Sequence, residues 1–142
     1  MSIEYKIHRA ILIHIRTAFP HIKIFHIPNQ SRDATEAFFN KQMGVLPGVS
    51  DFILGWSRKL YGGAGVGVLE VKTDDGKLSR KQNMFISWAD DIGWEWGVAR
   101  SVRQAHNVLK GWGLVPKHEA IAEPDLRTDE QKRKDCFDFY KP

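Results

Sequence analysis

Residues 66–72 read Val-Gly-Val-Leu-Glu-Val-Lys, a mostly apolar stretch with two charged side chains near its end. Successive side chains of a β-strand point to opposite faces, so Glu70 and Lys72 are expected to share one face of a strand whose neighbours are apolar. A second short apolar stretch, Asp-Phe-Ile-Leu-Gly at residues 51–55, begins with Asp51. If these two strands pair, the carboxylate of Asp51 lies within reach of Glu70.

This arrangement predicts a metal site. Two carboxylates held together in a partly buried place repel each other, and a raised pKa on one of them or a cation between them relieves the repulsion. Oxygen ligands from Asp51, Glu70 and the Val71 carbonyl suit Mg²⁺ or Mn²⁺, which also accept a phosphate oxygen. Lys72 is then placed to orient or deprotonate the attacking water. The pattern favours phosphodiester hydrolysis, and the alternative is a surface ion pair of Glu70 and Lys72 beside an unrelated Asp51.

The apolar pattern along the rest of the chain predicts the fold. It indicates helices and strands in the order α-β-α-β-β-α-β-α, an α/β fold of the α+β type in which helices flank a four-stranded mixed sheet. Helices are expected at residues 3–18, 34–42, 79–90 and 101–110, and strands at 21–27, 51–55, 66–72 and 94–99. The third helix is expected to bury an apolar stripe of Met84, Phe85, Trp88 and Ala89.

Length and charge indicate one compact domain followed by a charged segment. The 142 residues include 21 Lys and Arg and 17 Asp and Glu, which gives a formal net charge of +4. Residues 1–115 hold 15 of the basic and 10 of the acidic residues. The positive charge of this part favours a polyanionic partner such as nucleic acid. Residues 116–142 are predicted to form a charged C-terminal tail with a helix near 127–137.

The composition also excludes several kinds of site. Cys136 is the only cysteine, so an internal disulfide and a multi-cysteine zinc site are excluded. No apolar run approaches the roughly 20 residues that cross a bilayer, and the start of the chain is charged, so we expect a cytoplasmic protein with no membrane partner. His8, His14, His21 and His26 do not lie at a zinc-binding spacing and have no cysteine partners. His26 is the one histidine expected beside the predicted cleft.

Further motifs surround the two strands in a definite order. They are His26-Ile27-Pro28-Asn29 followed by Arg32, Gly44 through Gly48 to Asp51, Leu69-Glu70-Val71-Lys72, Leu78-Ser79-Arg80-Lys81-Gln82, Val98-Ala99-Arg100-Ser101 and Trp112-Gly113. Together they resemble the VRR-NUC domain, the small virus-type replication-repair nuclease of the PD-(D/E)xK superfamily. The resemblance covers about residues 3–115. It departs from the superfamily at Ser50, where a proline usually shapes the turn.

The resemblance implies a restriction-endonuclease-like PD-(D/E)xK core over residues 1–115. It implies a metal-dependent DNA endonuclease that uses Mg²⁺, for which Mn²⁺ substitutes. Asp51 and Glu70 would be metal ligands, and Lys72 would be the catalytic lysine.

Two further residues have alternative readings. By resemblance, Gln82 positions the lysine, the water or the phosphate, but Ser79 and Gln82 also match a capping box at a helix start. Glu4 matches an acidic residue that related nucleases use near a metal, and it also fits an exposed acid in the first turn of a helix.

Five residues are candidates for contacts with DNA. Asn29 and Arg32 follow a strand of the predicted cleft, and Lys77, Arg80 and Lys81 lie near the start of the third helix. Cationic and amide side chains in these places suit phosphate contacts. The alternative for each is a solvated turn or helix start.

The resemblance further implies a bacterial or phage-encoded enzyme of DNA repair that acts on branched DNA such as four-way (Holliday) junctions. Symmetric cutting of a junction needs two active sites, so a two-fold homodimer is expected. One alternative is a nuclease that nicks or cuts linear duplex DNA, either site-selective or restriction-like. The other is a DNA-binding module without catalysis.

Overall fold

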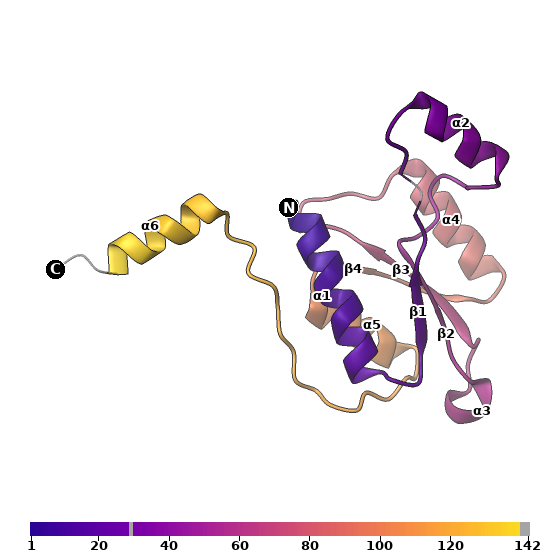
Figure 1. The fold of residues 1–142 in the computed structure, drawn as a ribbon. Helices are drawn as coiled ribbons and strands as arrows, with labels where there is room; N and C mark the ends of the chain where they lie inside the picture. The colour runs from indigo at the N-terminus through magenta and orange to yellow at the C-terminus, as the bar shows by residue number, and fades with distance from the viewer. Residues whose placement is uncertain (29, 140–142) are drawn as a thin grey trace.

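Helix caps and short apolar strands divide the chain into the elements drawn in Figure 1. This computed structural model describes residues 1–28 and 30–139. The elements are α1 (Ile3–Ala18), β1 (Lys23–His26), α2 (Ala34–Gln42), β2 (Phe52–Gly55), α3 (Arg58–Tyr61), β3 (Val66–Val71), α4 (Arg80–Asp91), β4 (Glu95–Ala99), α5 (Val102–Gly111) and α6 (Asp129–Phe139). The predicted order is confirmed, and α3 is an added single turn in the connection between β2 and β3.

The four strands form one mixed sheet in the order β1-β2-β3-β4. β2 pairs antiparallel with β1 and with β3, whereas β3 and β4 are parallel. Parallel neighbours need a long crossover, which α4 supplies. Phe52 lies opposite Leu69, so the antiparallel register brings the preceding Asp51 opposite Glu70.

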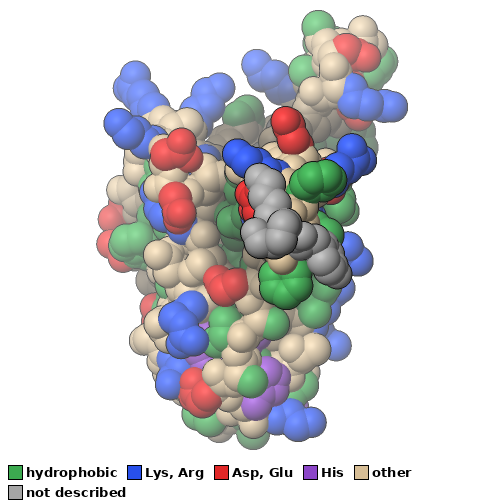
Figure 2. Space-filling model, turned by 90° about the vertical axis from the view of Figure 1, so that its left-hand side faces the viewer, with side chains coloured by type: hydrophobic (Ala, Val, Ile, Leu, Met, Phe, Trp, Pro, Cys, Tyr) green, Lys and Arg blue, Asp and Glu red, His purple; other side chains and the backbone are tan. Residues whose placement is uncertain are grey.

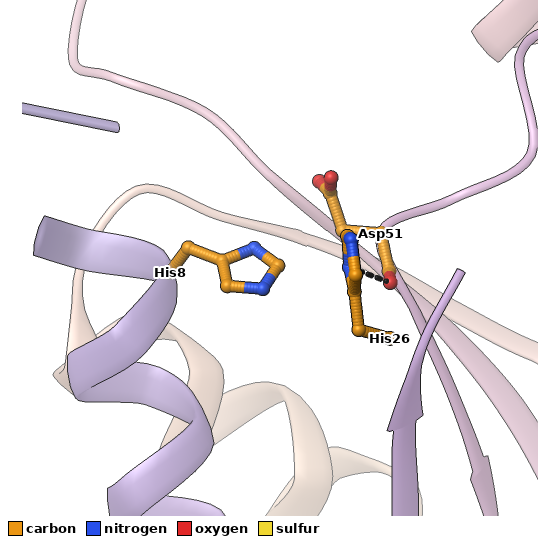
Figure 3. A group of neighbouring side chains, drawn as sticks. All are labelled: His8, His26 and Asp51. Carbon is orange, nitrogen blue, oxygen red and sulfur yellow. Dashed lines mark hydrogen bonds between the residues drawn. The ribbon is translucent and has the colours of Figure 1, made fainter. Parts of the chain in front are cut away.

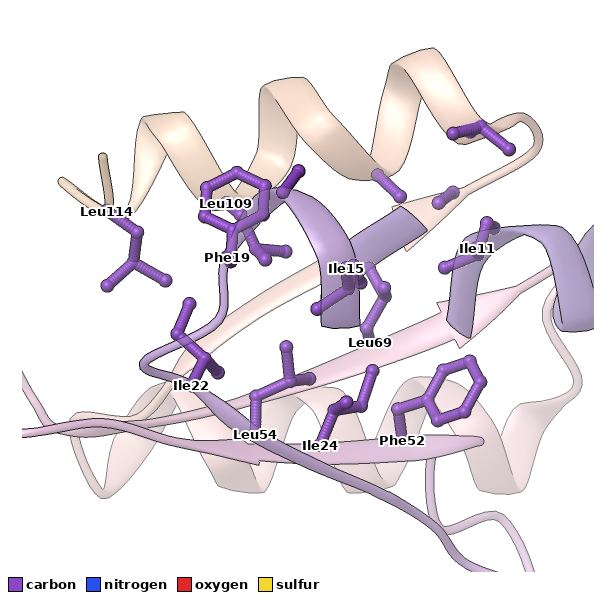
Figure 4. Close-up of a cluster of buried hydrophobic side chains, with 14 of the residues drawn as sticks. Ile11, Ile15, Phe19, Ile22, Ile24, Phe52, Leu54, Leu69, Leu109 and Leu114 are labelled. Carbon is purple, nitrogen blue, oxygen red and sulfur yellow. The ribbon is translucent and has the colours of Figure 1, made fainter. Parts of the chain in front are cut away.

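The main core lies between one face of the sheet and the helices α1 and α5, as Figure 4 shows. α1 contributes Ile7, Ile11 and Ile15, whose spacing of four residues keeps them on one face of the helix. The strands contribute side chains at alternate positions, and α5 packs its own apolar face above them. These strand and α5 residues are Phe52, Leu54, Leu69, Val71, Val102, Ala105 and Leu109.

The opposite face of the sheet is covered by α4, which packs against β4. Ile86 and Ala89 are the buried residues of this helix. The expected stripe is therefore wrong for two of its members, because Met84 and Trp88 are 62% and 47% exposed. Gln82, Ile86 and Ala89 lie four and three residues apart, and this row rather than the expected one faces the sheet.

The chain beyond α5 runs back along the molecule before α6. Oε2 of Glu119 accepts a hydrogen bond of 2.6 Å from the ring Nε2 of His106, and Oε1 forms an ion pair with Lys110 at 3.0 Å. α6 has no buried residue and projects away from the sheet (Figure 1). Of the helices in residues 1–28 and 30–139, none has the length and apolar composition needed to cross a membrane.

Candidate active site

The antiparallel pairing of β2 and β3 brings the predicted acidic residues together. Asp51 stands directly before β2, and its Oδ2 accepts a hydrogen bond of 2.7 Å from the backbone N–H of Val71. Glu70 occupies the neighbouring position of β3, and Lys72 follows the end of that strand. The backbone N–H of Lys72 bonds to the carbonyl of Ala99 at 3.0 Å, which extends the pairing with β4 by one residue. The backbone on both sides therefore fixes this end of the sheet.

Glu70 is a buried acid, with 2% of its surface exposed. Its Oε1 lies 3.7 Å from Nζ of Lys72 and accepts a hydrogen bond of 2.7 Å from Nε2 of Gln82. The pKa of Glu70 is raised to about 8, first by burial and then by the negative charge of Asp51, and the positive charge of Lys72 opposes the rise. The repulsion that the sequence predicts between these two carboxylates is therefore present in the fold.

A divalent cation fits this donor set. Oε2 of Glu70 is buried and has no hydrogen-bond partner among the described residues. A buried carboxylate oxygen without a partner is costly, and coordination to a cation removes that cost. Asp51 beside it supplies a second hard oxygen ligand of the type that Mg²⁺ and Mn²⁺ prefer. Val71, the candidate for a backbone ligand, lies between Glu70 and Lys72 with its side chain in the core.

Gln82 uses both ends of its amide group. Its Oε1 accepts a hydrogen bond of 2.8 Å from the backbone N–H of Ser79, and the hydroxyl of Ser79 accepts one of 3.2 Å from the N–H of Gln82. Because the Ser79 N–H needs an acceptor, the amide nitrogen must face the other way, toward Glu70. The capping box and the contact to the site were alternatives in the sequence, and the structure contains both.

A cleft of about 500 Å³ opens beside Asp51 and is lined by Ser2, Glu4, Tyr5, His8, His26, Pro28, Gln30 and Asp51. Glu4 thus lies at the same cleft as Asp51. Figure 3 shows His8 of α1 directed toward His26 and Asp51. Burial lowers the pKa of His8, Asp51 opposes this, and His26 lowers it further. His8 was missed because its position depends on how α1 crosses the sheet.

Arg100 is a second residue whose contacts the sequence did not indicate. Its guanidinium donates to the backbone carbonyls of Thr73, Gly76 and Asp74, the last two at 2.6 and 3.3 Å. These carbonyls belong to the turn that follows Lys72. Arg100 therefore ties the end of β4 to the turn after β3, and in the sequence it stands out only as part of the motif Val98-Ala99-Arg100-Ser101, directly after a buried strand.

Of the residues predicted to contact DNA, the four that the structure describes lie near the starts of α2 and α4 and do not form one cluster. Arg32 is exposed and pairs with Glu36 at 3.1 Å across the start of α2. Lys77, Arg80 and Lys81 are exposed around the start of α4. Figure 2 shows Lys and Arg side chains projecting from the upper end of the molecule, the end where Figure 1 places α2. Asn29 lies outside the described residues.

Comparison with known proteins identifies the fold. No protein-family model matches the chain, and no curated protein matches it. The solved structure of a VRR_NUC domain protein superposes with a TM-score of 0.59, and the match covers 79% of this chain and 88% of that one at 19% sequence identity. At this identity the likeness concerns the fold. The chain therefore has a mixed four-stranded α+β fold of the VRR-NUC and PD-(D/E)xK kind.

Proposed function

We propose that the protein is a divalent-metal-dependent nuclease that hydrolyses phosphodiester bonds of DNA. The observation that carries this proposal is the meeting of Asp51, Glu70 and Lys72 at one end of the sheet, where Oε2 of Glu70 is buried and has no hydrogen-bond partner within residues 1–28 and 30–139. The likeness to a VRR_NUC domain protein supports the same chemistry.

The site residues divide into ligands and groups that act on the phosphate. Asp51, Glu70 and the Val71 carbonyl would hold Mg²⁺, or Mn²⁺ in its place, and Glu4 is a further candidate; the ion supplies Lewis acidity and an activated water. Nζ of Lys72 lies next to this position, 3.7 Å from Oε1 of Glu70, where it would offset the negative charge that develops on the phosphate. Gln82 holds Oε1 of Glu70 in place through its own hydrogen bond.

The exposed basic residues at this end support DNA as the substrate. Arg32, Lys77, Arg80 and Lys81 stand on elements that flank the site, and we propose that they contact backbone phosphates together with Asn29. Such contacts are independent of sequence and weaken as salt is added. The positive net charge of residues 1–115 acts in the same direction.

Branched DNA is the proposed substrate, on the strength of the motif resemblance, and a four-way junction is its simplest form. The same resemblance supports a role in DNA repair in the cytoplasm of a bacterium or of a phage-infected host. A cleavage assay with Mg²⁺ on a four-way junction and on linear duplex of the same sequence tests the preference. Equal cutting of both would favour the alternative enzyme of linear DNA. Tight binding without cleavage in Mg²⁺ or Mn²⁺ would favour a binding module.

A variant pair tests whether the proposed site carries the activity. Lys72→Ala removes the ammonium group beside Glu70 and is expected to abolish cleavage. Lys59→Ala is the matched control, because Lys59 is exposed on α3, which Figure 1 places at the opposite end of the sheet. Cleavage by Lys72→Ala at the rate of the control would contradict the assigned site.

We propose further that a second copy of the chain covers the outer face of α4. Met84 and Trp88 are exposed there, and they line a mostly apolar hollow of about 430 Å³ with Leu46, Pro47, Phe85 and Lys81. A contiguous exposed apolar surface of this kind marks an interaction site, and junction cutting requires two active sites. Light scattering should give a dimer, and Trp88→Glu should give a monomer, whereas Leu60→Glu on α3 should not. A monomeric wild type would refute the dimer.

A further inference from the structure

Three segments that are distant in the sequence place metal-binding groups around one point. His8 comes from α1, His26 from the end of β1, and Asp51 from the turn before β2. The side-chain ligand atoms of these residues all lie within 4.8 Å of one another, on the wall of the 500 Å³ cleft (Figure 3). Glu4 lines the same cleft, one helical turn before His8.

The hydrogen bond of His26 orients its ring for binding. Nδ1 of His26 lies 3.0 Å from the backbone carbonyl oxygen of Asp51. A carbonyl oxygen only accepts hydrogen bonds, so Nδ1 must carry the proton. In the neutral ring, Nε2 is then left with a free lone pair. Histidines that bind metals typically donate their other ring N–H to a carbonyl or carboxylate in this way.

His8 is held next to this ring by packing. Its ring lies 4.2 Å from that of Phe52, between centroids, and meets the ring of His26 edge-on at 4.8 Å. Asp51 has spare capacity, since the N–H of Val71 occupies one of about four lone-pair positions on its carboxylate. A tetrahedral ion about 2.1 Å from each ligand holds its ligands about 3.4 Å apart, so the widest gap closes by on the order of 1 Å when an ion binds.

The chemistry of this set differs from that of the Asp51 and Glu70 pair. Imidazole nitrogens favour zinc-like transition metals, whereas Mg²⁺ prefers oxygen ligands only. Two histidines and one carboxylate, with a fourth position open to water, are a common ligand set of catalytic zinc. We propose that His8, His26 and Asp51 form a second metal site that binds Zn²⁺ or a similar transition-metal dication in preference to Mg²⁺.

The two sites share Asp51 but differ in every other ligand, which makes the proposal testable without DNA. The metal-free full-length protein is titrated with Zn²⁺ by calorimetry in a large excess of Mg²⁺, and with Co²⁺ by visible absorption. His8→Phe keeps a ring against Phe52 and removes the nitrogen, and His26→Ala removes the second one. Each is expected to weaken Zn²⁺ binding at least ~10-fold, as loss of a ligand or of its support does.

Controls separate this site from others in the chain. Glu70→Gln should leave Zn²⁺ affinity within about threefold, because Glu70 belongs only to the oxygen site. His21→Ala and His118→Ala should also bind as the wild type does, and circular dichroism checks that each variant is folded. The proposal is overturned if Mg²⁺ displaces Zn²⁺, if His8→Phe and His26→Ala bind normally, or if a control variant loses the ion instead. Failure of DNA cleavage has no bearing on this result.

Discussion

The two faces of β3 bury side chains of opposite character, apolar ones on one face and an acidic one on the other. Leu69 and Val71 are fully buried on the face covered by α1 and α5, where their side chains belong to the apolar core. Glu70 stands between them in the sequence and is 2% exposed, but it points to the other face, toward Gln82 and Lys72. One strand therefore carries part of an apolar core and a buried acid at almost the same depth.

The two faces contribute oppositely to stability. Burial of Leu69 and Val71 stabilises the fold by roughly 1.5–3 kcal/mol for each side chain. Burial of a carboxylate costs free energy unless all its lone pairs are satisfied, and Oε2 of Glu70 has no partner among residues 1–28 and 30–139. A residue that opposes folding is best explained by what it does in the site.

The largest expected effect separates chemistry from folding. Asp51→Asn and Glu70→Gln keep the shape of each side chain and remove its charge. Each should reduce DNA cleavage ~10³-fold or more, because metal binding and transition-state stabilisation act as one unit. Folding and most of the DNA binding should remain, since phosphate contacts supply the binding. Single-turnover assays measure the rate of cleavage, and filter binding measures the affinity for DNA. Near-normal cleavage by either variant would remove the metal site from the mechanism.

Stability should respond in the opposite sense on the two faces. Leu69→Ala should lower the free energy of unfolding by about 2–5 kcal/mol, as other buried leucines do. Glu70→Gln should leave it unchanged near neutral pH and raise it above about pH 8 in the metal-free protein, because only there does the buried carboxyl carry a charge that the neutral amide removes. Urea denaturation with a chelator present measures both. Loss of several kcal/mol in Glu70→Gln would mean that Glu70 supports the fold.

The pH dependence of stability should isolate the same carboxylate. The pKa of Glu70 rises from 4.5 in its ordinary state to about 8 in the fold, chiefly by burial. Between these values the folded state keeps a proton that the unfolded chain releases. The contribution of protonated Glu70 to the free energy of unfolding is therefore fully present below about pH 4.5 and is lost as pH rises to about 8. Across this range the free energy of unfolding falls by up to ~1.4 kcal/mol per pH unit. Denaturation of the metal-free wild type and of Glu70→Gln across this range should show a steeper fall for the wild type; parallel curves would contradict the shift.

The local pattern of the sequence was enough to predict this strand and its partner. Alternation assigned Glu70 and Lys72 to one face, and Asp51 was expected within reach of Glu70 if residues 51–55 paired with this strand. The structure confirms both, and register then brings Asp51 to Glu70. These features depend on a few neighbouring residues and on the geometry of a hairpin. The roles of the three side chains remain predictions.

Features that depend on how separate elements pack were not predictable in the same way. α4 carries two apolar rows, and the sequence alone does not indicate which one faces the sheet. The structure turns Ile86 and Ala89 inward, in line with Gln82, which bonds to Glu70, and leaves Trp88 outside. The meeting of His8 with His26 depends likewise on the crossing of α1 over β1. Neither the rotation of α4 nor the meeting of His8 with His26 can be predicted from the spacing of residues along the chain.

The smallest expected effect tests whether Gln82 is more than a helix cap. Gln82→Glu retains the acceptor for the N–H of Ser79, since Glu serves equally in a capping box. It replaces the amide nitrogen, which donates to Oε1 of Glu70 at 2.7 Å, by a carboxylate oxygen that cannot donate. The melting temperature should therefore change little, because the cap of α4 is kept. Cleavage should fall by ~10–100-fold, the usual effect of losing a hydrogen-bond partner of a metal ligand.

Gln104 offers a matched control for that variant. It occupies the same position of α5, three residues after the N-cap Ser101, and its Oε1 accepts a hydrogen bond of 2.8 Å from the backbone N–H of Arg100. Gln104→Glu makes the identical chemical change at a helix start where, in the part of the chain that the structure describes, the amide nitrogen of the glutamine bonds to no carboxylate. If both variants cut DNA as well as the wild type, Gln82 only caps α4. If Gln82→Glu alone is impaired, the same amide both starts the helix and holds the buried acid, which links the rotation of α4 to the geometry of the site.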